Sequence, residues 1–385
     1  MRTIDALPSL GTQDSKRLDE LEQHCLEESS KFIGYPCNAI YDYSQLFRFL
    51  RFSVNNIGDP FLPSNYHINS LEFEREVLKI FRELTEAPED SFWGYVTNGG
   101  TEGNMYGLFL ARELHPEGIV YYSEDTHYSV NKIMRVLNVR NIMIRSNPDG
   151  TMDLEDLRES INIHRDVPAI VNANIGTTMK GAIDDLAGIH EIIEDLAIQQ
   201  YYIHADAALS GMILPFVDDP QPWNFKSGID SISISGHKMV GSPIPCGVAV
   251  AKKSNVDRIA RSVEYVGTLD TTMTGSRNGI TPLFLWYAFR SRGMDGYRQT
   301  VRNCLQMADY TIEKLQSIGR DAWRNKNSVT VVFPRPSMEI ISRWQIAAHH
   351  EVAHIITMPH VTTELVDRVV EDIRKDSEKA PNGGK

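Results

Sequence analysis

A lysine follows an alternating polar and apolar stretch in the sequence Ser231-Ile232-Ser233-Ile234-Ser235-Gly236-His237-Lys238-Met239. The alternation of serine and isoleucine predicts a short strand that runs out at Gly236. An apolar site lowers the pKa of a lysine amine and frees its lone pair, so Lys238 suits a reactive amine. A surface lysine at a strand end is the alternative interpretation, and this stretch alone does not choose between the two.

Outward from this stretch, strands and helices alternate from residue 93 onward. Short apolar strands are predicted at 93–97, 119–122, 142–144, 169–173, 201–205, 232–235 and 248–251. Helices are predicted between them at 101–113, 129–138, 154–161 and 190–197. Seven strands that alternate with helices predict an α/β fold whose mostly parallel sheet is covered on both faces. In such sheets, ligands bind at the carboxyl ends of the strands.

The length of 385 residues predicts more than one domain. We divide the chain into an N-terminal helical arm, a large domain and a small C-terminal α/β domain, with bounds 1–60, 61–285 and 286–385. The arm has an amphipathic helix over 12–31, which lies either on a partner subunit or on its own domain. Helical segments over 280–316 lead into the small domain, where strands are predicted at 329–333 and 354–358 and a helix at 338–347.

Composition excludes several classes of protein. The net charge of −12 argues against nucleic acid as a partner, because neutralising phosphates requires basic patches. No apolar run approaches the roughly 18 residues of a membrane span, and residues 1–11 lack the apolar core of a signal peptide. The four cysteines are scattered without a C-x-x-C pair, so neither a zinc site nor a disulfide framework is predicted. These features fit a reducing cytoplasm.

A glycine-rich turn follows the first of these strands, in Thr97-Asn98-Gly99-Gly100-Thr101-Glu102-Gly103-Asn104. Its glycines let backbone N–H groups approach an anion, and the helix that begins there adds partial positive charge. We expect Gly100 and Thr101 to donate to a phosphate. The spacing is that of neither a P-loop nor a G-x-G-x-x-G fingerprint, and an ordinary tight turn is the alternative.

Polar side chains also stand at the ends of the second, fourth and fifth strands. Asp206 lies in His204-Ala205-Asp206-Ala207-Ala208, where small neighbours leave room for a flat ring. A buried carboxylate needs a cationic partner, and the pyridinium N–H of pyridoxal 5'-phosphate (PLP) would be one. A metal site is the rival interpretation, but no third ligand stands at a recognisable spacing. His127 can lie flat on such a ring or can simply begin a helix.

A phosphate cradle, His127, Asp206 and Lys238, in this order and all at strand ends, together indicate a PLP site. The order resembles the fold-type-I PLP enzymes, and more closely the group II amino-acid decarboxylases, over roughly residues 30 to 375. The resemblance implies that Lys238 carries PLP, Asp206 holds the ring nitrogen and His127 stacks on the ring. It also implies a set of residues around the cofactor, in which Gly100, Thr101, Ser235 and His237 hold the phosphate and Thr177 and Ala208 flank the ring.

Two further residues complete the expected site. Gly275-Ser276 resembles the segment through which this family reaches the neighbouring subunit's phosphate, which implies a homodimer; a turn with a serine cap is the alternative. Tyr66 follows the loop 56–65, which lines a pocket or lies on the surface, and we place Tyr66 with His127 on the substrate side. The proton donor to the substrate is left open between His127, Lys238 and water.

Within the family, the resemblance is to the bacterial branch that acts on histidine, through residues 93–105, 204–218 and 235–247. It implies decarboxylation of L-histidine to histamine and CO2. Residues 59–66 resemble instead the plant enzymes that act on serine, so decarboxylation of L-serine to ethanolamine, or of another polar amino acid, is the alternative. A different PLP reaction and a non-enzymatic scaffold are the more distant alternatives, because one PLP fold supports many reactions.

Overall fold

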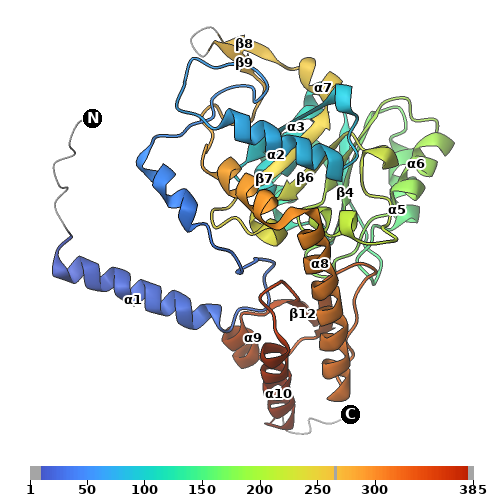
Figure 1. Cartoon of the computed structure of the whole chain (residues 1–385). Coiled ribbons are helices and arrows are strands. Elements are labelled where there is room, and N and C mark those ends of the chain that lie inside the picture. The colour runs from blue at the N-terminus through green and yellow to red at the C-terminus, as the bar shows by residue number, and fades with distance from the viewer. Residues whose placement is uncertain (1–9, 264–266, 380–385) are drawn as a thin grey trace.

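The computed structural model describes residues 10–263 and 267–379. Its centre is a seven-stranded sheet, and the predicted α/β fold class is confirmed (Figure 1). The strand order is β1-β7-β6-β5-β4-β2-β3. Their bounds are β1 Phe92–Thr97, β2 Ile119–Ser123, β3 Arg140–Ile144, β4 Ala169–Asn174, β5 Tyr201–Asp206, β6 Ser231–Ser235 and β7 Gly247–Lys252. Only β7 runs against its neighbours, so the sheet is mostly parallel, as predicted.

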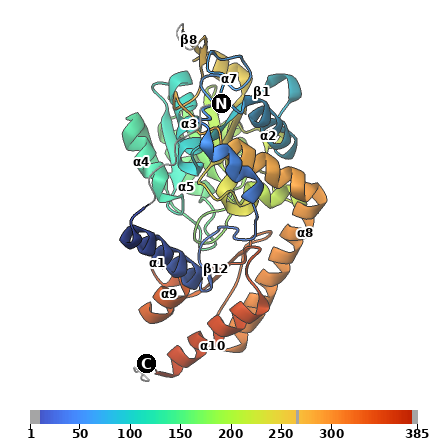
Figure 2. The ribbon, with the colours of Figure 1, turned by 60° about the vertical axis from the view of Figure 1, so that its left-hand side comes forward.

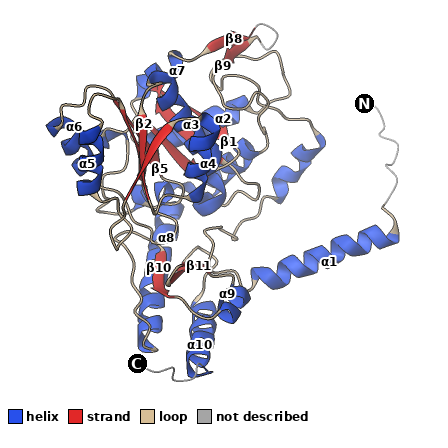
Figure 3. Cartoon of the chain, turned by 180° about the vertical axis from the view of Figure 1, so that it is seen from behind, coloured by secondary structure: helices blue, strands red, loops and turns tan. Residues whose placement is uncertain are grey.

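Both faces of this sheet are buried, because successive side chains of a strand point to opposite sides. Tyr95 and Tyr202 belong to one hydrophobic cluster, while their chain neighbours Val96 and Ile203 belong to the other. The helices of the two layers are α2 Leu71–Leu84, α3 Gly100–Leu114, α4 Tyr128–Leu137, α5 Leu154–Ile163, α6 Leu186–Asp195, α7 Lys253–Asp257 and the first part of α8 Thr281–Ser317. Figure 3 shows the strands enclosed between these helices.

A second, antiparallel sheet lies at the far end of α8, with strand order β10-β12-β11 (Figures 1 and 3). Its elements are β10 Thr330–Pro334, α9 Met338–Trp344, β11 Ala347–His349, β12 Val352–Ile356 and α10 Thr363–Lys379. The helix predicted to reach residue 347 ends at Trp344, because Gln345 has a left-handed backbone with φ of 50° and Ala347 begins a strand. A hairpin of β8 Arg261–Val263 and β9 Thr268–Asp270 was also outside the prediction.

The N-terminal helix α1, Thr12–Ser29, buries none of its residues in this chain. Leu18, Leu21 and Leu26 are 55%, 57% and 63% exposed. Figures 1 and 2 show α1 lying away from the large sheet, near α9, and Gln345 Nε2 donates to the Glu28 carbonyl at its end (2.9 Å). A 3-10 helix, Ser44–Arg51, follows along the chain. No helix in residues 10–263 or 267–379 has the length and apolarity needed to cross a bilayer.

Candidate functional site

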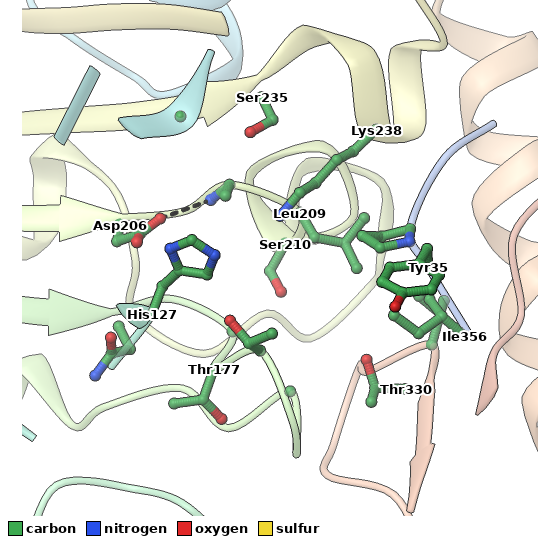
Figure 4. Close-up of a pocket in the computed structure, with 18 of the residues that line it drawn as sticks. Tyr35, His127, Thr177, Asp206, Leu209, Ser210, Ser235, Lys238, Thr330 and Ile356 are labelled. Atoms are coloured by element: carbon green, nitrogen blue, oxygen red, sulfur yellow. Dashed lines mark hydrogen bonds between the residues drawn. The ribbon is translucent and has the colours of Figure 1, made fainter. Parts of the chain in front are cut away.

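A cavity of about 200 Å³ opens at the carboxyl ends of the central strands (Figure 4). Its walls come from the large sheet, from the segment after α1 and from the small sheet. The residues expected around the cofactor that line this cavity are Gly100, Thr101, His127, Thr177, Asp206, Ala208, Ser235, His237 and Lys238. The tertiary structure thus brings together residues that are up to 138 positions apart in the chain, between Gly100 and Lys238.

Lys238 enters this cavity from a short turn of π-helix, Gly236–Val240, directly after β6. Its backbone departs from helical geometry, with φ of −87° and ψ of −106°. Burial lowers the pKa of the Lys238 amine, while the nearby Asp206 carboxylate and Cys37 oppose that shift. Among the described residues, no salt bridge includes this amine. A buried lysine with a lowered pKa suits a nucleophilic amine.

Asp206 closes β5 and is 7% exposed. One carboxylate oxygen accepts from Asn104 Nδ2 (2.7 Å) and the other from the Ala208 backbone N–H (3.3 Å). A carboxylate has further acceptor positions, and Figure 4 shows Asp206 at the cavity wall beside His127. The carboxylate can therefore accept a hydrogen bond from the protonated ring nitrogen of a ligand in the cavity.

The N-terminus of α3 also lines the cavity, through Gly100 and Thr101. Gly99 precedes the helix with φ of 145°, a backbone conformation that favours glycine. A Cβ atom at Gly100 would lie 2.9 Å from Ser235 Oγ and 3.8 Å from the Ala208 Cβ, so a side chain there would fill the space between these residues. His237 stands at the same place, with Nδ1 2.8 Å from the Cys246 carbonyl oxygen. Free N–H groups, a hydroxyl and an imidazole make this end suitable for a phosphate.

His127 begins α4 and accepts at Nδ1 from the Ser129 backbone N–H (3.3 Å). The same nitrogen lies 2.7 Å from Ser129 Oγ, so both the backbone and the side chain of Ser129 orient the ring. Burial lowers the pKa of His127, and Lys238 and Lys132 lower it further, whereas Asp206 raises it. Thr177 supports the loop beside His127, since its hydroxyl accepts from the Ala182 N–H (3.0 Å).

Two predicted residues lie outside the cavity of their own chain. Tyr66 donates its hydroxyl to the Ser53 carbonyl (2.7 Å), and Ser276 accepts from Asn55 Nδ2 (3.2 Å). Neither residue lines the cavity that contains Lys238. Sequence reasoning in turn missed the wall made by residues after α1 and by the small sheet: Gly34, Tyr35, Pro36, Ser328, Thr330, Ala347, His354 and Ile356. The segment 34–36 carried only the pattern of a helix breaker, so no local signal marked it.

The site fits PLP on its own geometry. A phosphate cradle, a buried lysine amine and a buried carboxylate stand around one cavity, and a Cβ at Gly100 would obstruct the cradle. Among the residues that the structure describes, no cluster of His, Cys, Asp and Glu could hold a metal ion. A doubly covered, mostly parallel sheet with this donor set at its strand ends defines a PLP-dependent enzyme of fold type I.

The chain belongs to the pyridoxal-dependent decarboxylase family, whose conserved-domain model matches residues 56–335. It is 50% identical to a histidine decarboxylase of Pseudomonas entomophila over 368 residues, which cover 95% of this chain and 91% of that protein. It is 49% identical to a histidine decarboxylase of Morganella morganii over 96% of this chain and 98% of that protein. An L-methionine decarboxylase structure from Streptomyces sp. 590 has a TM-score of 0.87 and 25% identity, and covers 97% of this chain and 98% of that one. The protein is therefore a PLP-dependent carboxy-lyase.

Proposed function

We propose that this enzyme converts L-histidine and one proton into histamine and CO2. The observation that carries the proposal is the pairing of a cavity that fits PLP with 49–50% identity to histidine decarboxylases over nearly the whole chain. Decarboxylation of L-serine, which the likeness of residues 59–66 suggested, is the alternative outcome of the test below.

The residues that line the cavity have different roles in the proposed reaction. PLP, when bound, supplies a conjugated ring that accepts the electron pair left behind as CO2 departs. Lys238 supplies the amine that anchors the cofactor, and its lowered pKa keeps a larger fraction of that amine neutral. Asp206 accepts the hydrogen bond of the ring nitrogen and so keeps that nitrogen protonated. His127, which lines the cavity, covers the ring.

The space beyond the strand ends suits a small polar side chain. Ser210 and Thr330 are 4% and 2% exposed, and Figure 4 shows both at the cavity. Tyr35 and Ile356 add apolar surface near Thr330. An imidazole carries one N–H donor and one acceptor nitrogen on a flat apolar ring, so it can use both hydroxyls and this surface together.

We also propose that the enzyme is a homodimer in the reducing cytoplasm. Helix α1 has 18 residues with no buried side chain, and an isolated helix of that length is only marginally stable in water. Its leucines therefore need a second surface, for which a further copy of the chain is our candidate. The position of Ser276 outside its own cavity is compatible with a role toward a partner's phosphate. Four free cysteines fit the proposed compartment.

The test is a product assay with the purified enzyme and PLP. L-histidine and L-serine are supplied separately, and the amines are identified by mass spectrometry, with Lys238→Ala as the matched inactive control. We expect histamine from the wild type and none from the variant. Formation of ethanolamine alone would identify L-serine as the substrate. The absence of both amines from a protein that carries PLP would overturn the proposed reaction.

A further inference from the structure

Behind the Asp206 carboxylate runs a buried row of three polar side chains that the proposed reaction does not use directly. Asn104 Nδ2 lies 2.7 Å from Asp206 Oδ2, and Asn104 Oδ1 lies 3.1 Å from His204 Nε2. His204 Nδ1 then lies 2.8 Å from Ser231 Oγ. Asn104, His204 and Ser231 are all 2% exposed or less. The row thus joins α3, β5 and β6 at one point.

The chemistry of these groups gives every hydrogen bond in the row the same direction. A carboxylate only accepts, so Asn104 must turn its NH2 group to Asp206 and its carbonyl oxygen to His204. Burial lowers the pKa of His204 to about 4, so the ring is neutral near pH 7 and has a single N–H. That proton must be on Nε2, where it donates to Asn104. Nδ1 is then an acceptor, and the Ser231 hydroxyl donates to it.

Packing holds this row in one arrangement. His204 pairs with Ser231 in the parallel register of β5 and β6, so the two side chains are neighbours on one face. Across from them, α3 carries Gly107, where a Cβ atom would lie 2.2 Å from His204 Nδ1. The helix can therefore approach the imidazole only because residue 107 has no side chain. Asn104 lies one turn before Gly107 on α3, where its amide contacts both His204 and Asp206.

We propose that Asn104 is a positioning residue that, oriented by His204 and Ser231, holds the Asp206 carboxylate in place for the ring nitrogen of PLP. The inference rests on the role proposed above for Asp206. Without the Asn104 donor, Asp206 would lose its shortest hydrogen bond among the described contacts, and a buried carboxylate that lacks a donor would rotate or draw in water. Cofactor affinity should therefore depend on a residue that supplies no charge of its own.

The experiment measures PLP binding to the apoenzyme, without any substrate. PLP is titrated into the wild type, Asn104→Ala, Asn104→Asp, Asp206→Asn and the double variant Asn104→Ala/Asp206→Asn, and the dissociation constant is read from the visible absorbance. The control is Asn172→Ala, which removes a buried asparagine of β4 whose amide atoms have no partner among the described residues. Circular dichroism and melting of each apoenzyme establish that it is folded.

We expect Asn104→Ala to weaken PLP binding about tenfold or more, the effect of losing a hydrogen bond to a charged group. Asn104→Asp keeps the volume but sets two carboxylates against each other, so it should bind PLP more weakly than Asn104→Ala. In the Asp206→Asn background, Asn104→Ala should have little further effect, because the group it positions is gone. The pH at which the visible absorbance of the bound cofactor changes should move in Asn104→Ala and stay unchanged in Asn172→Ala.

Several results would overturn the proposal. One is an affinity of Asn104→Ala within about twofold of the wild type, and another is an effect of equal size in both Asp206 backgrounds. Should Asn104→Ala fail to fold, Ser231→Ala serves in the same cycle, since it lies outside the cavity and reaches Asp206 only through the row. No loss of affinity in Ser231→Ala would then refute the inference. The substrate L-histidine is absent from these titrations. A failure to form histamine in the product assay therefore does not affect the PLP-binding result.

Discussion

Lys238 and Asp206 are both withdrawn from bulk water and line the same cavity from neighbouring parts of the sheet. Lys238 extends from the turn after β6, whereas Asp206 ends β5 one position away in the sheet. Burial lowers the pKa of Lys238, and the Asp206 carboxylate opposes that shift. At this scale, function depends on burial as much as on the identity of the side chains.

Replacing Lys238 with alanine should abolish the visible absorbance that PLP acquires when bonded to a lysine. The reason is that no other lysine lines the cavity among the described residues. Histamine formation should be lost as well, while the apoenzyme should melt at or above the wild-type temperature, because a buried amine is removed. The measurement is an absorbance spectrum with added PLP, and a persistent wild-type band would refute the role of Lys238.

His204 should make the stability of the protein sensitive to acid. Its pKa is about 4 in the folded protein and 6.5 ordinarily, so the unfolded chain binds the proton more readily. The neutral His204 ring therefore contributes fully to the free energy of unfolding above pH 6.5. As the pH falls toward 4, this contribution of about 3 kcal/mol is lost. Urea unfolding at pH 7 and pH 4.5 should show a smaller acid loss in His204→Gln than in the wild type. The exposed His24 is the control position, and His24→Gln should retain the full loss.

At the scale of elements, a buried ion pair connects α2 to the segment that contains Ser276. Glu74 and Arg277 form a salt bridge with side chains that are nearly inaccessible. The Glu74 carboxylate also accepts from the Val96 N–H (2.9 Å) and from Asn56 Nδ2 (2.7 Å), and Arg277 donates to the Gly58 carbonyl (3.1 Å). The pair thus ties α2, β1 and two loops together.

Arg277→Leu should lower the free energy of unfolding by about 3–5 kcal/mol, because it leaves the Glu74 charge buried and unpaired. The double variant Glu74→Leu/Arg277→Leu should cost less than the two single losses combined. Arg290→Leu is the matched control, since it removes the exposed partner of Glu76 on the same helix and should cost about 1 kcal/mol or less. Urea unfolding measures the wild type, the two single variants of the pair, the double variant and Arg290→Leu, and equal losses in Arg277→Leu and Arg290→Leu would contradict the prediction.

At the scale of the molecule, the cavity lies where the large sheet, the segment after α1 and the small sheet meet. His354 of β12 shows this meeting, since its two ring nitrogens lie 3.1 Å from the Met179 carbonyl oxygen and 3.0 Å from that of Gly34. The predicted division at residues 60 and 285 stays a prediction, and the long helix α8 runs across its second boundary. Movement of the small sheet would therefore reshape the substrate end of the cavity.

The proposed dimer predicts that α1 is an interface helix. Leu18→Asp combined with Leu21→Asp should convert the wild-type dimer into a monomer in sedimentation velocity, because two charges would enter an apolar contact. Gln23→Asp adds a charge to the same helix and should leave the dimer intact. A wild-type protein that sediments as a monomer would refute the proposal, as would a dimer that survives both leucine substitutions.

Contiguous residues were sufficient to predict the seven strands and to single out Gly100, Thr101, Asp206 and Lys238, which line one cavity. Strand burial and glycine turns are local properties, and parallel strands place their carboxyl ends along one edge. The wall of Tyr35, His354 and Thr330 depended on tertiary contacts alone, and so did the row from Ser231 to Asn104. These side chains come from parts of the chain that are 100 residues or more apart, or from two paired strands. No local periodicity encodes such a contact.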